Sequence, residues 1–394
     1  MRRLSSLGLN ESLRRASIPL LIVGLIFAIY FISNSTPLQW YKHYVYQSQA
    51  FLEGRTDLQD FPEYYHDLVS YEGKYYLASP PMPALVLLPA VAIWGEDTDQ
   101  IRISMLIGAV NVALVWILLG RLGADGRKRW LLTVLFGLGT VHWEVATHGT
   151  TWFFAEIVAV LFLLLCLIEH FGRRRAFLVG LLLGFAVMSR LPILLGSIFF
   201  LVTLSQQGGF PKRPLQFLAG LALPLAFLGY FNFIRFGDPL ETGYFAHTYA
   251  AYFAADVEQH GFFSLHYIPK QLYTLLLLPP EYIDHFPFLR PYPEGMSILL
   301  TTPAVFYVLR ARFSEARNLW AGLAVLAILL PIMLWFSTGW VQFGYRYSLD
   351  FFPFLLILIS SGMGSRLSKG MIALVALSVA VNLWGTLWSV HLGW

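Results

Sequence analysis

Carboxylate side chains gather in one polar, tyrosine-rich stretch near the start of the chain, between residues 34 and 100. Asp67 follows Tyr65 and His66 directly, and Asp57 lies slightly earlier. Such a carboxylate can act as the base that takes a proton from an attacking hydroxyl, whether burial raises its pKa or a nearby cation lowers it. We therefore predict Asp67 as the catalytic base, Asp57 as the second candidate, and Tyr65, His66 and Lys74 as substrate contacts. The competing interpretation is that these are solvated loop residues.

Three arginines lie at the ends of apolar runs, where a phosphate at a membrane surface would be met. They are Arg190, Arg235 and Arg346, and Tyr347 follows the last of them. A guanidinium binds a phosphate through two parallel hydrogen bonds. We predict a phosphate-binding role for these side chains, with Arg346 the first candidate and Tyr347 beside it. The alternative is that each arginine pairs with an acid or reaches to lipid headgroups.

A metal site is a weaker possibility. His142, Glu144, His148 and Glu156 are close in sequence and could hold a divalent metal, but their spacing matches no specific zinc pattern. We assign no metal ligand and no certain cofactor. The sequence also lacks the glycine-rich phosphate loop and the Gly-x-Ser-x-Gly turn, which makes ATP use and serine-hydrolase chemistry unlikely functions.

The elements that must position these residues are apolar. Of the 394 residues, 57% are hydrophobic and 13% are charged, about half the charged share of a typical soluble domain. The net charge of +4 comes from basic residues in short connections between apolar runs, so it indicates membrane topology and not nucleic-acid binding. The single cysteine, Cys166, excludes an intrachain disulfide.

Most of the Lys and Arg residues fall in six short connections, and the positive-inside rule places all six in the cytoplasm. This requires an uncleaved first span with a cytoplasmic N-terminus. We predict an all-α polytopic membrane protein with about eleven transmembrane helices, at 18–33, 101–120, 130–147, 152–170, 176–189, 191–206, 215–234, 294–310, 318–337, 349–364 and 370–390.

The outer side then carries two large loops. The apolar segment 83–95 is too short to span, so we predict that it lies along the outer membrane surface after Ser79-Pro80-Pro81-Met82. Residues 1–394 form a single membrane domain in this prediction. The loops 34–100 and 235–293 are expected to form an extracytoplasmic cap.

Short motifs add a family resemblance. Pro80-Pro81-Met82 opens the predicted surface helix, Phe-Gly-Asp-Pro-Leu-Glu-Thr-Gly-Tyr occupies 236–244, and Gly-Tyr-Arg-Tyr at 344–347 precedes Phe-Pro-Phe at 352–354. In these motifs and in its layout the chain resembles the GT-C glycosyltransferases, among them bacterial relatives of the protein mannosyltransferases and of the lipid A aminoarabinose transferase.

This resemblance implies transfer of a sugar from a polyprenyl-phosphate donor to an unidentified acceptor at the extracytoplasmic face of the bacterial plasma membrane. The family's usual first-loop Asp near the end of the first span is missing, because 36–43 contains no acid. The lysine that precedes Pro-Pro in the aminoarabinose transferase is Ser79 here. We therefore expect inverting displacement with Asp67 or Asp57 as base and Arg346 on the leaving phosphate.

Two other functions stay open at this stage. One is a non-catalytic transporter or lipid-handling protein, although the ionisable residues gather at the outer ends of the predicted spans and no internal repeat is visible. The other is a polymerase or ligase of surface polysaccharide, which would share the donor and the membrane side but use different residues.

Overall fold

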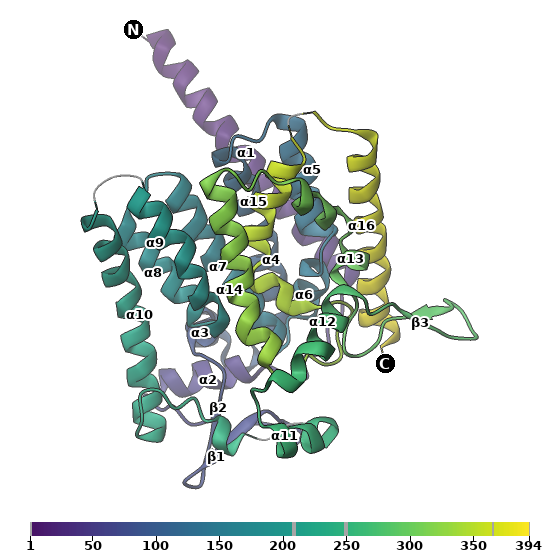
Figure 1. The fold of residues 1–394 in the computed structure, drawn as a ribbon. Coiled ribbons are helices and arrows are strands. Elements are labelled where there is room, and N and C mark those ends of the chain that lie inside the picture. Colours follow the sequence, from purple (N-terminus) through teal and green to yellow (C-terminus); the bar gives the residue numbers. More distant parts are fainter. Residues whose placement is uncertain (1, 207–209, 248–250, 365, 394) are drawn as a thin grey trace.

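The computed structural model describes residues 2–206, 210–247, 251–364 and 366–393, and it is mostly helical (Figure 1). The body of the molecule is a bundle of α1 (Arg2–Ser33), α4 (Gln100–Arg121), α5 (Gly126–Leu138), α7 (Thr151–Phe171), α8 (Ala176–Val187), α9 (Ser197–Gln206), α10 (Lys212–Phe236), α14 (Ala316–Leu334), α15 (Phe352–Gly362) and α16 (Lys369–Leu387).

Shorter elements join these helices. The short α-helices are α2 (His43–Leu52), α3 (Met82–Trp94), α6 (His142–His148), α11 (Ala254–His260), α12 (Ile268–Leu276) and α13 (Ile298–Thr301). Two antiparallel hairpins are formed by β1 (Leu68–Tyr71) with β2 (Lys74–Leu77) and by β3 (Glu281–Tyr282) with β4 (Leu289–Arg290). The 3₁₀ turns that matter below are η2 (Leu191–Gly196), η3 (Tyr244–Ala246), η6 (Pro303–Arg310) and η7 (Arg346–Asp350).

Five of the described helices are long and apolar enough to cross a membrane: α4, α7, α10, α14 and the segment 369–392. Shorter apolar helices cover 17–33, 176–187, 191–206 and 352–362. Every predicted span therefore contains helix, but some are interrupted. Gly139 ends α5, so the predicted span 130–147 is broken between α5 and α6. Pro303 follows α13 and opens η6, because proline lacks the donor that would continue an α-helix.

The bundle has a continuous apolar core in which α4 packs against α1, α5, α6 and α7. Helices α8 and α10 pack very closely. A Cβ atom at Gly180 would lie 2.0 Å from the Phe217 carbonyl oxygen, and one at Gly220 would lie 2.0 Å from the Phe177 carbonyl oxygen. Small residues allow two backbones to approach this closely, as is common between membrane helices.

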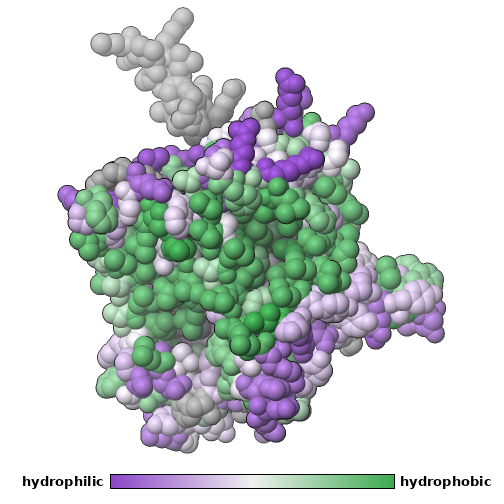
Figure 2. Space-filling view, in the orientation of Figure 1, coloured by the Kyte–Doolittle hydropathy of each residue, from purple (hydrophilic) through white to green (hydrophobic). Residues whose placement is uncertain are grey.

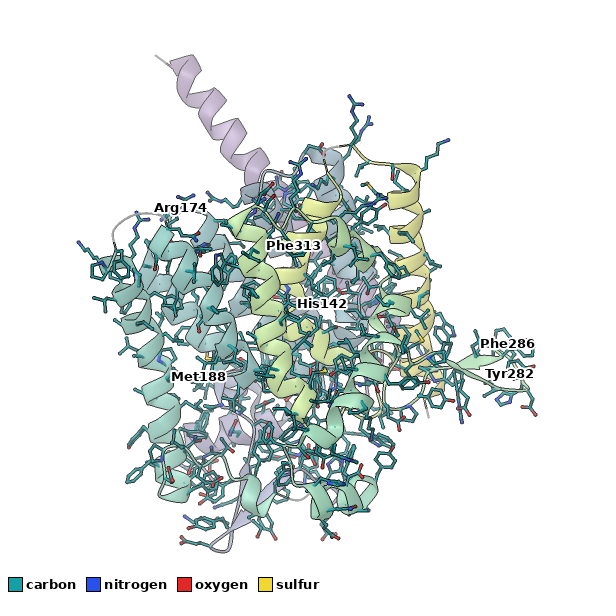
Figure 3. All side chains as sticks on the ribbon, in the orientation of Figure 1. His142, Arg174, Met188, Tyr282, Phe286 and Phe313 are labelled. Carbon is teal, nitrogen blue, oxygen red and sulfur yellow. The ribbon has the colours of Figure 1, made fainter. Side chains whose placement is uncertain are left out.

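The two ends of the bundle differ in chemistry. The connections that carry the basic clusters lie at the end where α1 begins, where Figure 3 labels Arg174 and Phe313. Lys128 links two of these connections by donating to the carbonyl of Gly364 at 2.8 Å. Figure 2 shows an apolar belt between this end and the polar loops at the opposite end. The basic connections thus share one end, as the alternation of spans requires.

The two predicted outer loops meet at the opposite end. The first loop folds into α2, the β1–β2 hairpin and α3, around a small core that includes Tyr44, Leu87 and Phe154 of α7. The segment 83–95 forms α3, which begins after Pro81 and packs against α2 and α7. Val69 of β1 makes an isolated antiparallel bridge to His247 of the second loop. The loops therefore pack on each other over the mouth of the bundle.

Candidate functional site

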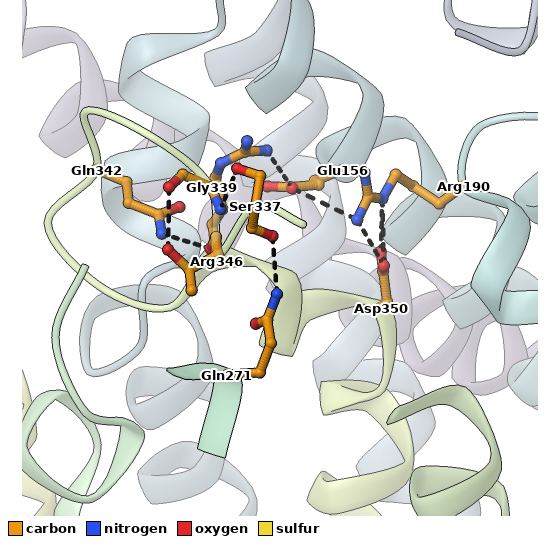
Figure 4. A network of polar contacts seen from close by, with 9 residues as sticks. Glu156, Arg190, Gln271, Ser337, Gly339, Gln342, Arg346 and Asp350 are labelled. Carbon is orange, nitrogen blue, oxygen red and sulfur yellow. Dashed lines mark hydrogen bonds and ion pairs between the residues drawn. The ribbon is translucent and has the colours of Figure 1, made fainter. Parts of the chain in front are cut away.

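Three buried charged residues, Glu156, Arg346 and Asp350, and the partly exposed Arg190 form a network where the helix bundle meets the outer loops (Figure 4). Arg190 donates to both carboxylate oxygens of Asp350, from Nη2 at 2.8 Å and from Nε at 3.1 Å. Arg346 donates from Nη1 to Glu156 at 2.6 Å, and Arg190 Nη2 lies 4.0 Å from the same Glu156 oxygen. Two carboxylates and two guanidiniums balance each other, so the network is neutral as a whole.

Tyr347 links the two arginines. Both guanidinium carbons lie 4.8 Å from the centre of its ring, a distance suited to cation–π attraction. The two arginines differ in exposure: the Arg190 side chain is 21% exposed, whereas the Arg346 side chain is 6% exposed. Arg190 is therefore the guanidinium that an anion can reach. Arg346 is linked to Arg190 through Glu156, whose carboxylate lies near both guanidiniums.

Several buried polar atoms around the network lack a hydrogen-bond partner within the described part of the chain. They include Arg346 Nε, Glu156 Oε2, Gln342 Oε1 and the Tyr44 hydroxyl. Buried donors and acceptors are nearly always satisfied, so such atoms indicate room for water or ligand oxygens. Arg346 Nε and Glu156 Oε2 belong to the network itself, so they are consistent with a polar ligand or water beside it.

The chain positions Arg346 and Asp350 together on η7, one turn apart. The loop before η7 is tied down at several points: Tyr345 donates to Gln271 Oε1 of α12 at 2.6 Å, and Glu144 of α6 accepts from the Phe343 backbone at 2.7 Å. Gly344 passes so close to α6 that an added Cβ would lie 2.4 Å from Val141. These contacts hold η7 against α7 and the Arg190 segment.

Asp67 lies on the inner side of the first loop, at the start of β1. Its Oδ1 is 3.4 Å from His66 Nδ1, a charge contact without hydrogen-bond geometry. The His66 ring stacks on Trp152 of α7 with 5.3 Å between ring centres. Asp67 has a positive φ of 59°, a conformation that Asp tolerates better than most residues. Its carboxylate is therefore held in a fixed turn among aromatic rings.

Tyr244 of the second loop connects Asp67 with the arginine network. Burial raises the pKa of Tyr244 to about 12, while Arg190 lowers it and Tyr347 and Asp67 raise it further. Asp67 and Arg190 are thus both within electrostatic reach of one hydroxyl. A backbone hydrogen bond of 3.0 Å from Met82 to the Met188 carbonyl also ties the Pro-Pro element to the Arg190 segment. The first loop therefore contacts the segment that carries Arg190.

Asp57 and Lys74 belong to a different place. They line an open cavity of about 780 Å³ on the first loop, together with Asp60, Glu63 and the ring of Tyr65. Asp57 accepts a hydrogen bond from Gln59 at 2.8 Å. Tyr65 lines this cavity, and its ring centre also lies 4.2 Å from that of His43. The sequence had placed both acids in one site, and the fold separates them.

Arg235 does not join the other arginines. It is buried at the end of α10, where Nη1 donates to the Leu77 carbonyl of β2 at 2.8 Å and Nη2 donates to Asn232 at 2.8 Å. Its guanidinium also lies over the rings of Phe231 and Phe236. This side chain fastens the first loop to α10, because its donors are used by the protein itself.

The four residues weighed as a metal set do not converge. His142 Nδ1 lies 3.0 Å from the Tyr30 hydroxyl, and His148 contacts Ser389. Glu144 accepts from the Phe343 backbone, and Glu156 pairs with Arg346. Across the described ranges no group of three or more His, Cys, Asp or Glu side chains is arranged to hold a metal. His142, Glu144 and His148 belong to α6 and Glu156 belongs to α7, and each of the four side chains has a partner of its own.

Sequence reasoning missed Asp350, Tyr244 and Tyr44 as members of the region, and it weighed Glu156 as a metal ligand only. A signal existed for Asp350, which lies one helical turn after Arg346 at the start of a predicted span. An acid at that position needs a partner because burying an unpaired charge is costly. No sequence signal distinguishes Tyr44 or Tyr244 from the other tyrosines of the loops.

The fold has known relatives among solved structures. ArnT, the aminoarabinose transferase of Cupriavidus metallidurans in a structure bound to undecaprenyl phosphate, matches 94% of this chain and 76% of its own with a TM-score of 0.57 and 14% identity. The oligosaccharyltransferase of Archaeoglobus fulgidus, tethered to an acceptor peptide, matches 96% of this chain and 55% of its own with a TM-score of 0.46 and 13% identity. No protein-family model and no curated protein matches the sequence. The likeness to ArnT shows that this chain shares the fold of an aminoarabinose transferase, the kind of protein that its motifs and layout resemble.

Proposed function

Given this GT-C-type fold, we propose that the protein transfers a sugar from a polyprenyl-phosphate donor to an acceptor at the extracytoplasmic face of a bacterial plasma membrane. The observation that carries the proposal is the pair of arginines, Arg190 and Arg346, at the mouth of an apolar bundle with Asp67 in electrostatic reach. A lipid phosphate needs cations where the apolar bundle ends, and these two guanidiniums supply them.

The same proposal includes the topology. The basic end of the bundle lies in the cytoplasm with the N-terminus, about eleven helical segments cross the membrane, and the loops 34–100 and 235–293 form a cap on the outer side. The shared location of the basic connections and the bridge between Val69 and His247 support this arrangement. The partners are then the lipid-linked sugar and the surrounding membrane lipids.

In the proposed reaction Asp67 takes the proton from the acceptor's nucleophilic group as that group attacks the anomeric carbon of the donor sugar. The bond between this carbon and the phosphate oxygen breaks, and polyprenyl phosphate leaves with the electron pair. Asp67 is favoured over Asp57 because Tyr244 links it electrostatically to Arg190, whereas Asp57 faces the open cavity with Lys74. His66 beside Asp67 orients the carboxylate.

Arg190 is the first cation for the phosphate in this proposal. Its side chain keeps exposed surface, while Arg346 is engaged with Glu156 and nearly buried. As negative charge develops on the leaving phosphate, Arg190 donates to it, and Arg346 and Tyr347 hold Arg190 in position. Charge-assisted hydrogen bonds from a preorganised guanidinium stabilise that charge more than mobile water would.

The test uses the full-length protein in lipid nanodiscs and a panel of undecaprenyl-phosphate-linked sugars, with release of undecaprenyl phosphate as the readout. Membrane extracts supply the acceptor. We expect turnover with at least one donor and a loss of roughly 10²–10⁴-fold in Asp67→Asn, the usual contribution of a general base. Asn keeps the size of Asp and tolerates positive φ, so the fold of the turn is preserved.

Asp60→Asn is the matched control, since Asp60 also has a positive φ in the first loop but lines the open cavity. It should keep full turnover. Equal turnover in Asp67→Asn and the unmodified protein would contradict the assignment of the base. Failure of the protein to release undecaprenyl phosphate from every donor, together with failure to bind undecaprenyl phosphate, would contradict the proposed function.

A further inference from the structure

The second outer loop exposes apolar side chains along a continuous stretch. Helix α12 buries Gln271, Thr274 and Leu275 and leaves Leu272 and Leu276 exposed, and Leu277 directly after the helix is exposed as well. In a water-soluble protein an amphipathic helix turns its leucines inward and its polar residues outward. Here two polar residues are buried while three leucines face outward, as expected where the surroundings are not water.

The hairpin that follows continues this surface. Tyr282 is 72% exposed and Phe286 is 82% exposed, and the ring of Phe288 lies 6.3 Å from that of Phe286. Figure 3 labels Tyr282 and Phe286 on the β3–β4 hairpin, which leaves the side of the molecule. At the base of the hairpin, Arg290 donates to Glu281 at 2.6 Å, so these two charges neutralise each other. We call the set Leu272, Leu276, Leu277, Tyr282, Phe286 and Phe288 the interfacial strip.

The position of the strip identifies what covers it. In Figure 1 the β3–β4 hairpin extends sideways at the level where α16 ends, and α16 belongs to a candidate span covering 369–392. Figure 2 shows the apolar belt reaching down to this level. Aromatic side chains concentrate at the depth where membrane spans meet water, because their rings suit the headgroup region. A strip continuous with the belt and level with the end of a span lies at that depth.

We infer that the interfacial strip docks α12 and the β3–β4 hairpin onto the outer leaflet, with its apolar side chains at the boundary of headgroups and acyl chains. A lipid surface fits better than a protein partner, because the strip projects outward as a hairpin at the edge of the belt. Helices of this kind bury their apolar face about 5–10 Å into that boundary. This inference rests on the membrane embedding of the chain and not on the proposed sugar transfer.

The docking has a consequence for the site. Gln271, on the buried face of α12, donates to the carbonyls of Trp335 and Ser337 and accepts from the Tyr345 hydroxyl. Arg346 follows Tyr345 directly. The helix that contacts the lipid is thus the one that holds the segment leading into the arginine network, and it sets the height of that segment relative to the membrane surface.

Spin labels on single cysteines in the full-length protein test the inference. The native Cys166 is buried and is replaced by Ala in the background. Labels are placed by Phe286→Cys and Leu277→Cys, and by Tyr75→Cys as the matched control, an exposed aromatic on the other hairpin of the chain. The protein is reconstituted as one copy per nanodisc of phosphatidylcholine and phosphatidylglycerol. The readout compares collision of each label with oxygen, which concentrates in lipid, and with a water-soluble nickel chelate.

We expect the ratio of oxygen to nickel collisions to be several-fold higher at positions 277 and 286 than at position 75. Ratios equal to that of position 75 would show that the strip faces water and would overturn the inference. Low collision with both reagents at 277 and 286 would mean that protein covers the strip, which also overturns it. The readout reports position only, so its failure leaves the proposed activity untouched.

Discussion

The arginine network and the open cavity of the first loop contain similar residues in opposite surroundings. In the network, Glu156 and Asp350 are buried, and each accepts a hydrogen bond from a guanidinium. In the cavity, Asp60, Glu63 and Lys74 are exposed to solvent. The comparison teaches that carboxylates alone do not identify a site. What matters is whether the fold removes water and supplies cations in its place.

The largest expected effect comes from breaking the network. In Glu156→Ala the buried guanidinium of Arg346 loses its counterion, and removal of one partner of a buried pair typically costs about 3–5 kcal/mol. The measurement is the unfolding free energy of the detergent-purified protein. The double variant Glu156→Gln with Arg346→Gln should recover part of the loss, since no charge is then left unpaired. If Glu156→Ala is as stable as the unmodified protein, the network is not needed for the fold.

The next effect concerns turnover and separates the two regions directly. Arg190→Lys keeps the charge but loses the two-pronged contact with Asp350 and the planar donor set for phosphate. We expect release of undecaprenyl phosphate to fall by roughly 10²–10³-fold, the usual cost of removing one donor to a developing anion. Lys74→Met, which removes the cation of the cavity, is the control and should leave turnover unchanged. Equal losses in both variants would argue that the cavity belongs to the site.

Lowering the pH should destabilise the folded protein through His43, a buried histidine of α2. Burial lowers the pKa of His43 to about 4, although the contact of its Nε2 with the His66 carbonyl at 3.0 Å raises the pKa, so the folded protein keeps this ring neutral above about pH 4. Between about pH 6.5 and pH 4 the unfolded chain binds a proton at this histidine and the folded chain does not. The unfolding free energy should therefore fall as the pH falls through this window, by up to about 1.4 kcal/mol for each pH unit.

The check is to measure the unfolding free energy at several pH values in the unmodified protein and in His43→Asn. The variant should show a flatter dependence on pH. His285→Asn, which alters an exposed histidine on the β3–β4 hairpin, should keep the original slope. If all three proteins show the same slope, the neutral His43 does not contribute to it.

The smallest effect is expected in the cavity. Asp60→Asn and Glu63→Gln alter exposed acids, and such surface changes usually stay within about 0.5 kcal/mol of the original stability. Turnover should also be unchanged, measured with the same donor panel. A tenfold loss of turnover in either variant would show that the cavity contacts substrate, and the contrast between the two regions would then fail.

Much of the fold could be predicted from local patterns. The helical segments follow the apolar runs, and the basic connections share one end of the bundle. The breaks within the predicted spans were harder to predict. Hydropathy alone does not show that a helix ends at Gly139 or just before Pro303. For the site, Arg190, Arg346 and Tyr347 were predicted and lie together in the network, and His66 and Asp67 lie side by side on the first loop. Asp57, the second candidate base, lines the cavity, and Arg235, a further candidate for the phosphate, binds the Leu77 carbonyl and Asn232.

By itself the sequence determined that this chain is a helical membrane protein with polar, aromatic loops at one end, because transfer of apolar side chains out of water depends on local composition. Only the tertiary structure decided which charges meet. Arg346 and Glu156 are 190 residues apart in the chain, and Arg190 and Asp350 are 160 apart. Pairing over such separations depends on how α7, η2 and η7 pack together, and no local pattern specifies that packing. The same packing buried Arg346 and Glu156 together, whereas Asp57 lies at the edge of the first-loop cavity beside Gln59.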